Sequence, residues 1–480
     1  MRWQWIALLL CSGQLAVAQE QLGLSHSNYM PLEGGLLNPA RYAGQWPYAD
    51  LRVLGVGLNI WNDLVALSGS DHSLVGEIRN GLNGTSGPDP VLRTSFSERD
   101  KKATTLLDLR GPAASISMGR GTFGFSLRSR AALSVTGVPA SMGRFMINGL
   151  NHAPQRGVRY RDDNIRQVMA TWNDASIHYA RIVQASGFGM LSAGASVSYR
   201  MGHAAAILRF DELDYTILDT MRAVVHGTSG TYTLAMPGTG IGRGWGADLG
   251  VSYERTFEEV DRYLPHRSST GCKPMGYRYR LGLSIIDLGG MQFRDVQGGA
   301  FSGTDVAIDD HQALSIEGTD ELDSLLRSDM STYRPVDRIR LGAPTALSIQ
   351  YDHRLREKVY IGTVWVQQIS SPRGTRIRRP NTLAISPRFE TRVFEAALPI
   401  TIREYDLRRP MIGLMMRFNN LVLGSDHIVP LFTRQDIHAV DVYAMLRINM
   451  HRSPFCRGRR RSNRSHAPGS MEQLPCILPQ

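Results

Sequence analysis

The segment Trp245-Gly-Ala-Asp-Leu-Gly-Val-Ser-Tyr-Glu254 carries the most regular alternation in the chain. Its odd positions are apolar, and its even positions are glycine, serine or an acidic residue. Successive side chains of a β-strand point to opposite faces, so this segment predicts a strand with one apolar face and one polar face. Similar segments recur from Leu51 to Met450. The predicted fold class is therefore all-β.

The N-terminus has the features of an export signal. Arg2 precedes a short apolar run, and Ala16-Val-Ala18 forms a small-residue cleavage site, so residues 1–18 are predicted to be a cleaved signal peptide. No later segment reaches 18 uncharged apolar residues, which excludes an ordinary membrane helix. Backbone polar groups in hydrocarbon must be satisfied internally. If the exported chain spans a membrane, it must therefore do so as a closed β-barrel.

Two hairpins show the pattern most clearly. One joins residues 104–118 to 123–135 through a glycine-containing turn, and the other joins 175–183 to 188–201. The whole chain predicts a transmembrane antiparallel β-barrel of about 14 strands (12–16), with short loop helices. The predicted organisation is as follows: residues 1–18 signal peptide, 19–50 N-terminal plug or periplasmic segment, 51–450 outer-membrane β-barrel, and 451–480 a basic, disordered tail.

A soluble periplasmic β-protein is the main structural alternative, because half-buried strands of a sandwich alternate in the same way. Aromatic residues make up only 8% of the chain, which is low for a barrel with full aromatic girdles. The many glycine and serine residues on the polar faces nevertheless favour a crowded barrel interior. No repeat of 40–50 residues is visible, which argues against a propeller.

Three short motifs resemble a known class of barrels. Asn38-Pro39-Ala40 resembles the N-terminal NPA element of the long-chain fatty-acid transporter type of outer-membrane barrel. Gly244–Tyr253 resembles the G-x-D-x-G-x-x-Y strand of those barrels and of PorV-like barrels of Bacteroidota, and Leu281–Gly289 resembles the strand that follows. The chain looks most like a Bacteroidota family of such barrels that is known as a domain of unknown function.

This resemblance implies about 14 strands and an N-terminal segment inside the lumen, which would make residues 19–50 a plug. No fatty-acid-binding residue can be matched to a position in this chain, so that activity is not carried over.

Charged residues on the polar faces are the predicted lumen residues. An arginine facing lipid at the bilayer midplane costs about 2–4 kcal/mol, so these side chains should point inward. The lumen-facing candidates are Arg128, Arg130, Arg200, Asp248, Glu254, Arg278, Arg280 and Asp352. Two interpretations stay open: a salt-bridge network that fills a plugged lumen, which we favour, and a lumen that favours anions.

No catalytic signature is present: the sequence lacks H-E-x-x-H, G-x-S-x-G, a Walker loop and a zinc-type Cys/His cluster. We therefore predict no catalytic residue, metal site or cofactor, and a protein that is not an enzyme. Cys272, Cys456 and Cys476 remain after cleavage, and a Cys456–Cys476 disulfide is one option. The basic residues 452–464 indicate either a solvated tail or contact with lipopolysaccharide phosphates.

The leading functional hypothesis is a channel or transporter for a small molecule, with a hydrophobic cargo included, in the outer membrane of a Gram-negative bacterium. The first alternative is a non-transporting barrel that docks to a secretion or surface-assembly machine, and the second is a periplasmic β-rich binding protein. Expected partners are outer-membrane lipid and lipopolysaccharide, with a secretion-machinery protein as a further option; nucleic acid is not expected. The facing of residues 245–254 predicts that Leu249→Arg abolishes assembly and that Ser252→Arg is tolerated.

Overall fold

The computed structural model describes residues 21–68, 91–94, 99–148, 153–236, 241–267, 271–308, 324, 327–328, 330–369, 375–432 and 437–456. The predicted signal peptide and residues 457–480 of the predicted tail lie outside these residues.

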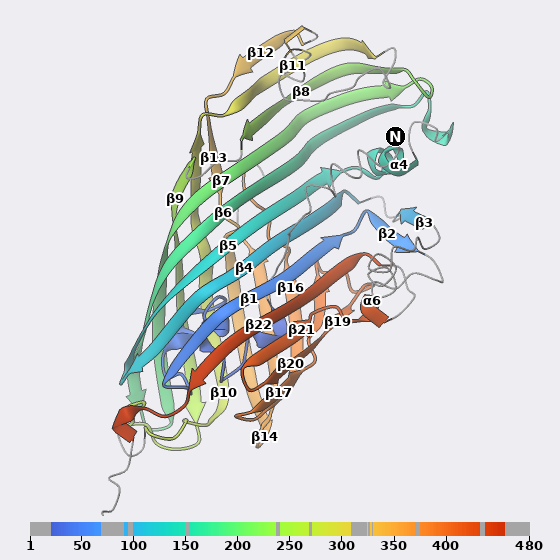
Figure 1. The fold of residues 1–480 in the computed structure, drawn as a ribbon. Coiled ribbons are helices and arrows are strands. Elements are labelled where there is room, and N and C mark those ends of the chain that lie inside the picture. Colours follow the sequence, from blue (N-terminus) through green and yellow to red (C-terminus); the bar gives the residue numbers. More distant parts are fainter. Residues whose placement is uncertain are drawn as a thin grey trace, which may run out of the picture.

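The strands close into a barrel (Figure 1). The first wall strand, β1 (Ala49–Asn62), pairs with the last, β22 (Ala439–Met450), from Ala49 opposite Met450 to Trp61 opposite Ala439. Because the first and last strands pair, the sheet has no open edge through the height of β1. The predicted antiparallel transmembrane barrel of about 14 strands is confirmed: the chain makes 14 passes.

Most passes are single strands, and the others are interrupted by a bulge or a short break. The single strands besides β1 and β22 are β4 (Lys101–Met118), β5 (Gly121–Val138), β6 (Arg159–Ser186), β7 (Gly189–Ile217), β15 (Val359–Gln368), β16 (Thr382–Glu390) and β21 (Leu421–Ser425). The interrupted passes are β8 (Ala223–Ala235) with β9 (Gly242–Thr256), β10 (Tyr277–Arg294) with β11 (Gln297–Ile308), β12 (Thr332–Pro335) with β13 (Arg338–Gly342) and β14 (Ala346–Arg356), β17 (Phe394–Ala397) with β18 (Ile400–Arg403), and β19 (Met411–Ile412) with β20 (Leu414–Phe418).

The chain also forms short helices and a small two-stranded sheet outside the barrel strands. The prediction of short loop helices is confirmed. They are η1 (Leu22–Leu24), α2 (Pro31–Gly34), η2 (Pro39–Tyr42), α4 (Ala140–Asn148), η4 (Ala153–Gln155), α6 (Val429–Phe432), η5 (Pro454–Cys456), and the pair β2 (Val65–Ser68) and β3 (Val91–Thr94). Among the described residues, no helix combines the length and hydropathy needed to cross a bilayer.

The barrel wall is higher on one side than on the other (Figure 1). β6 and β7 are 28 and 29 residues long, well beyond the roughly 9–11 residues that a tilted strand needs to cross a bilayer. β9 pairs with the lower half of β7, and β8 pairs with its upper half. The sequence pattern placed the end of β7 at Met201 because the register shifts at His203, which inverts the alternation beyond it.

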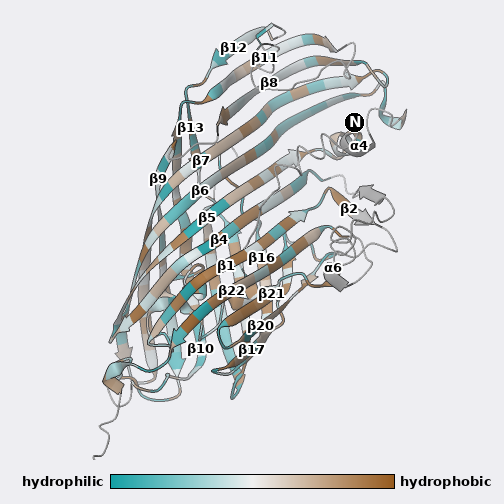
Figure 2. Cartoon of the chain, in the orientation of Figure 1, coloured by the Kyte–Doolittle hydropathy of each residue, from teal (hydrophilic) through white to brown (hydrophobic). Residues whose placement is uncertain are grey.

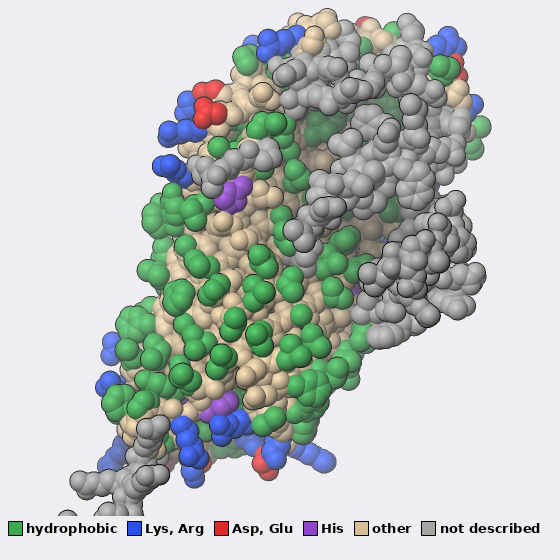
Figure 3. Space-filling view, in the orientation of Figure 1, with side chains coloured by type: hydrophobic (Ala, Val, Ile, Leu, Met, Phe, Trp, Pro, Cys, Tyr) green, Lys and Arg blue, Asp and Glu red, His purple; other side chains and the backbone are tan. Residues whose placement is uncertain are grey.

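The outer wall is apolar, as expected for a surface in lipid. On β9, Trp245 and Leu249 are 65% and 52% exposed, whereas Ser252 on the opposite face is buried. Apolar side chains cover the visible outer wall, and basic side chains gather at the lower rim (Figure 3). Colouring by hydropathy shows the same alternation along β1, β4 and β5 (Figure 2). The wall therefore presents its apolar stripes outward and not to a shared protein core.

Residues 21–48 lie inside the lower part of the barrel, at the end where β1 begins and β22 ends (Figure 1). We call this segment the plug. Its helix η2 contacts β6, β7 and β9 from within. Leu22 and Leu24 of the plug are fully buried against neighbouring parts of the wall, Leu22 on the side of β10 to β16 and Leu24 on the side of β17 to β22. The plug therefore fills the lumen at this end.

Candidate functional site

The NPA motif attaches the plug to the wall. The Asn38 side-chain amide donates hydrogen bonds to the Val251 carbonyl (3.0 Å) and to Gln350 Oε1 (2.9 Å). Asn38 Oδ1 accepts from the Ala40 backbone N–H (3.0 Å), which caps η2, and Pro39 occupies the first helical position, where no N–H is needed. One side chain thus both starts the helix and anchors it to β9 and β14.

The wall facing this motif is made of glycine. A Cβ at Gly194 of β7 would meet the Pro39 carbonyl, and a Cβ at Gly250 or Gly282 would meet the Asn38 side chain. The polar-face glycines of residues 245–254 and 281–289 therefore have a reason to be glycine: they allow the plug backbone to approach. The three motifs that resemble known barrels, around Asn38, Gly250 and Gly282, therefore contact one another in the folded chain.

Ion pairs tie the plug to the wall beyond this contact. Glu33 lies between two buried arginines, with 2.9 Å to Arg52 and a second pair to Arg110. Burial raises the pKa of Glu33, but Arg52 and Arg110 outweigh burial and hold the pKa below its ordinary value. Arg110 also pairs with Asp108 (2.8 Å), which in turn binds Arg128. Each buried charge thus has an opposite charge beside it.

A second network lies at mid-height. Asp287 and Asp174 each bind both Arg130 and Arg200, at 2.6–3.2 Å, and Asp287 also binds Arg379 (2.5 Å). We call these five residues the belt. Asp248 accepts a hydrogen bond from the Asp287 backbone N–H (2.7 Å). The belt links β5, β6, β7 and β10 across the inside of the barrel.

A β-bulge places Asp287 in the belt. The register of β10 against β9 shifts between Ile285 and Leu288, and Asp287 has a positive φ of 54°. The bulge lets Ile286 and Asp287 both be buried, although adjacent strand residues ordinarily face opposite sides. Three arginines surround the carboxylate.

A third network fills the lower lumen around Asp352. Arg388 lies between Asp352 (3.1 Å) and Glu390 (2.8 Å), and Glu395 binds Arg417 (3.0 Å). A small polar cavity beside Asp352 is lined by Ser25, His26, Gly34, Arg41, Ser252, Arg280, Gly282, Gln350 and Asp352.

Most of the predicted lumen residues do face inward and take part in these networks. They are Arg128, Arg130, Arg200, Asp248, Glu254, Arg280 and Asp352, with Glu254 and Arg280 bound to each other. The prediction is wrong for Arg278, which is exposed. A register shift between Tyr277 and Tyr279 reverses the facing there, so Tyr277 takes the inward position and donates a hydrogen bond to Asp352 (2.5 Å).

Sequence analysis missed several partners of these residues. Asp174 and Arg388 lie on the polar face of predicted strands, or one residue beyond, so the alternation alone could have found them. Asp287 could not be found in this way because the bulge, not the alternation, turns it inward. Arg379 belongs to a connection outside the strands, for which no periodic signal exists.

Above the belt several lumen-facing positions are apolar, although Ser134 of β5 also faces inward. Moving up β5, the inward side chains change from Ser126, through Arg128 and Arg130, to Ala132; moving up β7, they change from Ser196, through Arg200, to Ala205 and Ile207. These upper residues belong to one buried apolar cluster, which we call the upper chamber. Its members are Ala132, Val168, Ala170, Trp172, Ala205, Ile207, Ala235, Met291, Phe293, Ile339, Leu341 and Ile377.

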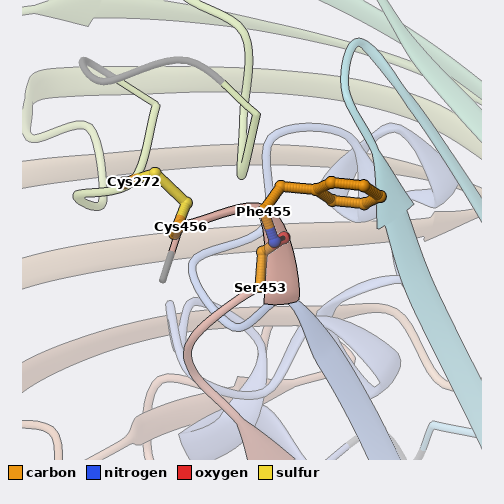
Figure 4. The surroundings of a disulfide bond; sticks show 4 residues. All are labelled: Cys272, Ser453, Phe455 and Cys456. Atoms are coloured by element: carbon orange, nitrogen blue, oxygen red, sulfur yellow. Dashed lines mark hydrogen bonds between the residues drawn. A yellow bond between two sulfur atoms is a disulfide. The ribbon is translucent and has the colours of Figure 1, made fainter. Parts of the chain in front are cut away.

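A disulfide bond lies at the lower end of the barrel, and it does not join the cysteines that the sequence analysis offered as an option. Cys272 is bonded to Cys456, so the option of a Cys456–Cys476 disulfide is wrong (Figure 4). The bond links the β9–β10 connection, residues 257–276, to the segment after β22. The same connection contributes Val260 and Tyr263 to an apolar cluster with the plug. The two cysteines are close only in the folded chain, so the spacing of cysteines along the sequence could not predict this bond.

Comparison with known proteins places the chain in a family. A family model described as "Family of unknown function (DUF5723)" matches residues 79–426, more than half of the chain. The chain belongs to the DUF5723 family. None of the curated proteins compared with this DUF5723 chain is similar to it in sequence.

Solved structures similar to this DUF5723 barrel include two toluene transporters and a FadL homologue. The toluene transporter TbuX of Ralstonia pickettii has 10% identity and a TM-score of 0.39, with 87% of this chain and 93% of that chain covered. The toluene transporter TodX of Pseudomonas putida has 12% identity and a TM-score of 0.38, with 86% and 91% covered. The FadL homologue of Pseudomonas aeruginosa has 9% identity and a TM-score of 0.21, with 87% and 94% covered.

Proposed function

We propose that the protein is an outer-membrane channel of a Gram-negative bacterium that admits a small, uncharged hydrophobic molecule. The apolar outer wall fits residence in a bilayer. Membrane lipid and lipopolysaccharide are the partners that this location implies. A single feature carries the cargo class: the upper chamber is lined by apolar side chains on lumen-facing positions.

Such a lining is unusual for a water-filled pore, whose inner face is polar. Burial of apolar surface contributes roughly 25 cal/mol per Å², so a chamber of this kind favours an apolar solute over water or an ion. In the charged networks below the chamber, acidic and basic side chains of the described residues pair with each other, which disfavours an anion pore. The proposal therefore puts cargo recognition in the upper chamber and closure in the plug and belt.

The experiment measures uptake of radiolabelled toluene by intact Gram-negative cells that carry or lack the protein. The lipopolysaccharide leaflet keeps background entry low. Cells with the protein should accumulate toluene several-fold faster, and a water-soluble solute such as glucose should enter at the same rate in both strains. Equal toluene uptake with a correctly folded barrel would reject the proposal.

The tightly closed lumen favours a second candidate, a barrel that transports nothing and serves as a docking partner for a secretion machine. In the described part of the chain, the plug occupies the lower lumen apart from the small cavity beside Asp352, and paired charges and buried apolar side chains lie above it. The uptake experiment separates the two candidates because a docking barrel should leave toluene entry unchanged.

A further inference from the structure

The described end of the connection between β15 and β16 crosses the lumen. Its residues 375–381, which we call the crossbar, begin at β13, where the Gly342 backbone donates to the Thr375 carbonyl (2.9 Å) and accepts from the Ile377 N–H (3.1 Å). The Arg378 backbone N–H donates to Ser134 Oγ of β5 (3.4 Å). β13 and β5 are separated around the wall by β10, β9, β7 and β6. The crossbar therefore spans the inside of the barrel.

Two ion pairs hold the crossbar in place through Arg378 and Arg379. Arg378 pairs with Glu404 (2.5 Å), which also binds Lys102 of β4 (3.0 Å). Arg379 joins the belt through Asp287 (2.5 Å). The plug supplies none of these contacts, so the crossbar is a closure separate from the plug.

One side chain of the crossbar is apolar where its neighbours are charged. Ile377 lies between Arg376 and Arg378, yet it is 1% exposed and belongs to the upper chamber with Phe293, Leu341 and Ile207. The chamber is thus filled by a residue that comes from a connection and not from the wall.

A second observation points to a ligand in the same chamber. Trp172 is 1% exposed, and within the described part of the chain its indole Nε1 has no hydrogen-bond acceptor. A buried N–H without an acceptor costs about 1–3 kcal/mol. The π face of an aromatic ring, or a single ether or carbonyl oxygen, would be sufficient to satisfy it. A carboxylate would instead have to lose its hydration in an apolar chamber.

We propose that the upper chamber is a binding site for a compact, uncharged aromatic molecule, and that Ile377 occupies this site until the crossbar is displaced. The proposal rests on the proposed function and adds the place, the ligand class and the residue that the ligand replaces. Displacement needs loss of the Arg378–Glu404 and Arg379–Asp287 pairs, after which Glu404 keeps Lys102 and Asp287 keeps Arg130 and Arg200 as partners. The part of the belt that remains in place then has two aspartates and two arginines, so its charges are balanced.

The test uses quenching of Trp172 fluorescence by bromobenzene in the purified full-length protein. The Trp172→Phe variant supplies the signal of the other tryptophans, which is subtracted. Ile377→Ala opens space in the chamber, and Arg379→Ala removes one of the two charged contacts of the crossbar, so each should raise the Trp172 quenching constant at least threefold. Ile385→Ala on the lipid face of β16 and Arg338→Ala, an exposed arginine, are the matched controls and should leave it unchanged.

Heat-modifiable gel mobility confirms that each variant is folded. Unchanged quenching in folded Ile377→Ala and Arg379→Ala overturns the proposal, as does stronger quenching by the anion 4-bromobenzoate than by bromobenzene. Toluene uptake by cells without Trp172 quenching in any variant rejects this site and leaves the proposed function standing. Trp172 quenching without uptake retains the site and rejects the channel.

Discussion

Two residues of this barrel show why a single position can tolerate few other side chains. Asp287 of the belt faces the lumen only because β10 bulges, and it forms ion pairs with three arginines. Gly250 is required because the Asn38 side chain lies where its Cβ would be. Leu249, one position away, faces lipid. Position 250 therefore requires the absence of a side chain, whereas position 249 requires an apolar side chain that faces lipid.

Asp287→Asn should destabilise the folded barrel by about 3–5 kcal/mol, because it leaves buried arginines short of a counter-charge. Guanidinium unfolding in detergent, followed by gel mobility, measures this loss. Asp337→Asn, which removes an exposed pair with Arg338, should change the free energy of unfolding by less than about 0.5 kcal/mol. Equal effects of the two substitutions would show that the belt contributes nothing particular.

Gly250→Ala should loosen the plug while the wall still assembles, because the new Cβ overlaps Asn38. The expected result is faster cleavage of the plug by added protease and unchanged heat-modifiable mobility. Gly227→Ala is the matched control, since a Cβ there meets only Asp214 at 4.0 Å. Equal protease sensitivity of both variants would contradict the assigned contact.

Leu249→Arg should cost about 2–4 kcal/mol and prevent assembly, because it places a charge in lipid. Leu249→Phe should assemble normally. The structure changes the companion expectation for Ser252→Arg: Ser252 is buried and lines the cavity beside Arg41 and Arg280, so an arginine there meets like charges in a filled space. We now expect that substitution to disturb the plug too, and membrane fractionation of both variants checks this.

At the level of elements, the plug is held by polar contacts as well as by apolar burial. Its attachment therefore depends on protonation. His26 is fully buried in the plug, with Nε2 3.2 Å from the Thr363 carbonyl oxygen. Burial lowers the pKa of His26 to about 4, aided by Arg388 and Arg41 and opposed by Asp352.

This pKa gives a pH window for plug docking. The released plug binds a proton at His26 below pH about 6.5, whereas the docked plug binds it only below about 4. The stabilising contribution is therefore complete above pH 6.5 and is lost between pH 6.5 and 4, by on the order of 3 kcal/mol. Protease accessibility of the plug across this range measures it. His26→Gln should remove this part of the pH dependence; an unchanged profile would contradict the assignment.

At the level of the whole molecule, different parts of the chain occupy the barrel at different heights. The disulfide and the β9–β10 connection lie at the lower end, the plug and belt above them, and the crossbar at the upper chamber. These parts come from residues far apart in sequence. The disulfide alone joins positions 184 residues apart.

Cys272→Ser should lower stability by about 4–5 kcal/mol at most, because the bond closes a long loop in the unfolded chain. Guanidinium unfolding with and without dithiothreitol measures the effect. The reductant should lower the unfolding midpoint of the natural protein and leave that of Cys272→Ser unchanged. A reductant effect of the same size in the variant would assign the stabilisation elsewhere.

The barrel architecture and the inward facing of most charged candidates could be predicted from sequence, because both follow from a local period of two residues and the cost of charge in lipid. The NPA contact could be anticipated only through resemblance. Bulges at Asp287, at residues 277–279 and at His203 invert the period, so Arg278 and the length of β7 could not be predicted.

The tertiary structure alone decided the partners of each charge, the Cys272–Cys456 bond and the placement of Ile377 inside the barrel. The physical reason is that alternation along a strand records which face meets lipid, and that depends only on neighbouring residues. Contacts across the lumen depend on closure of the sheet, which brings together residues that no local pattern connects.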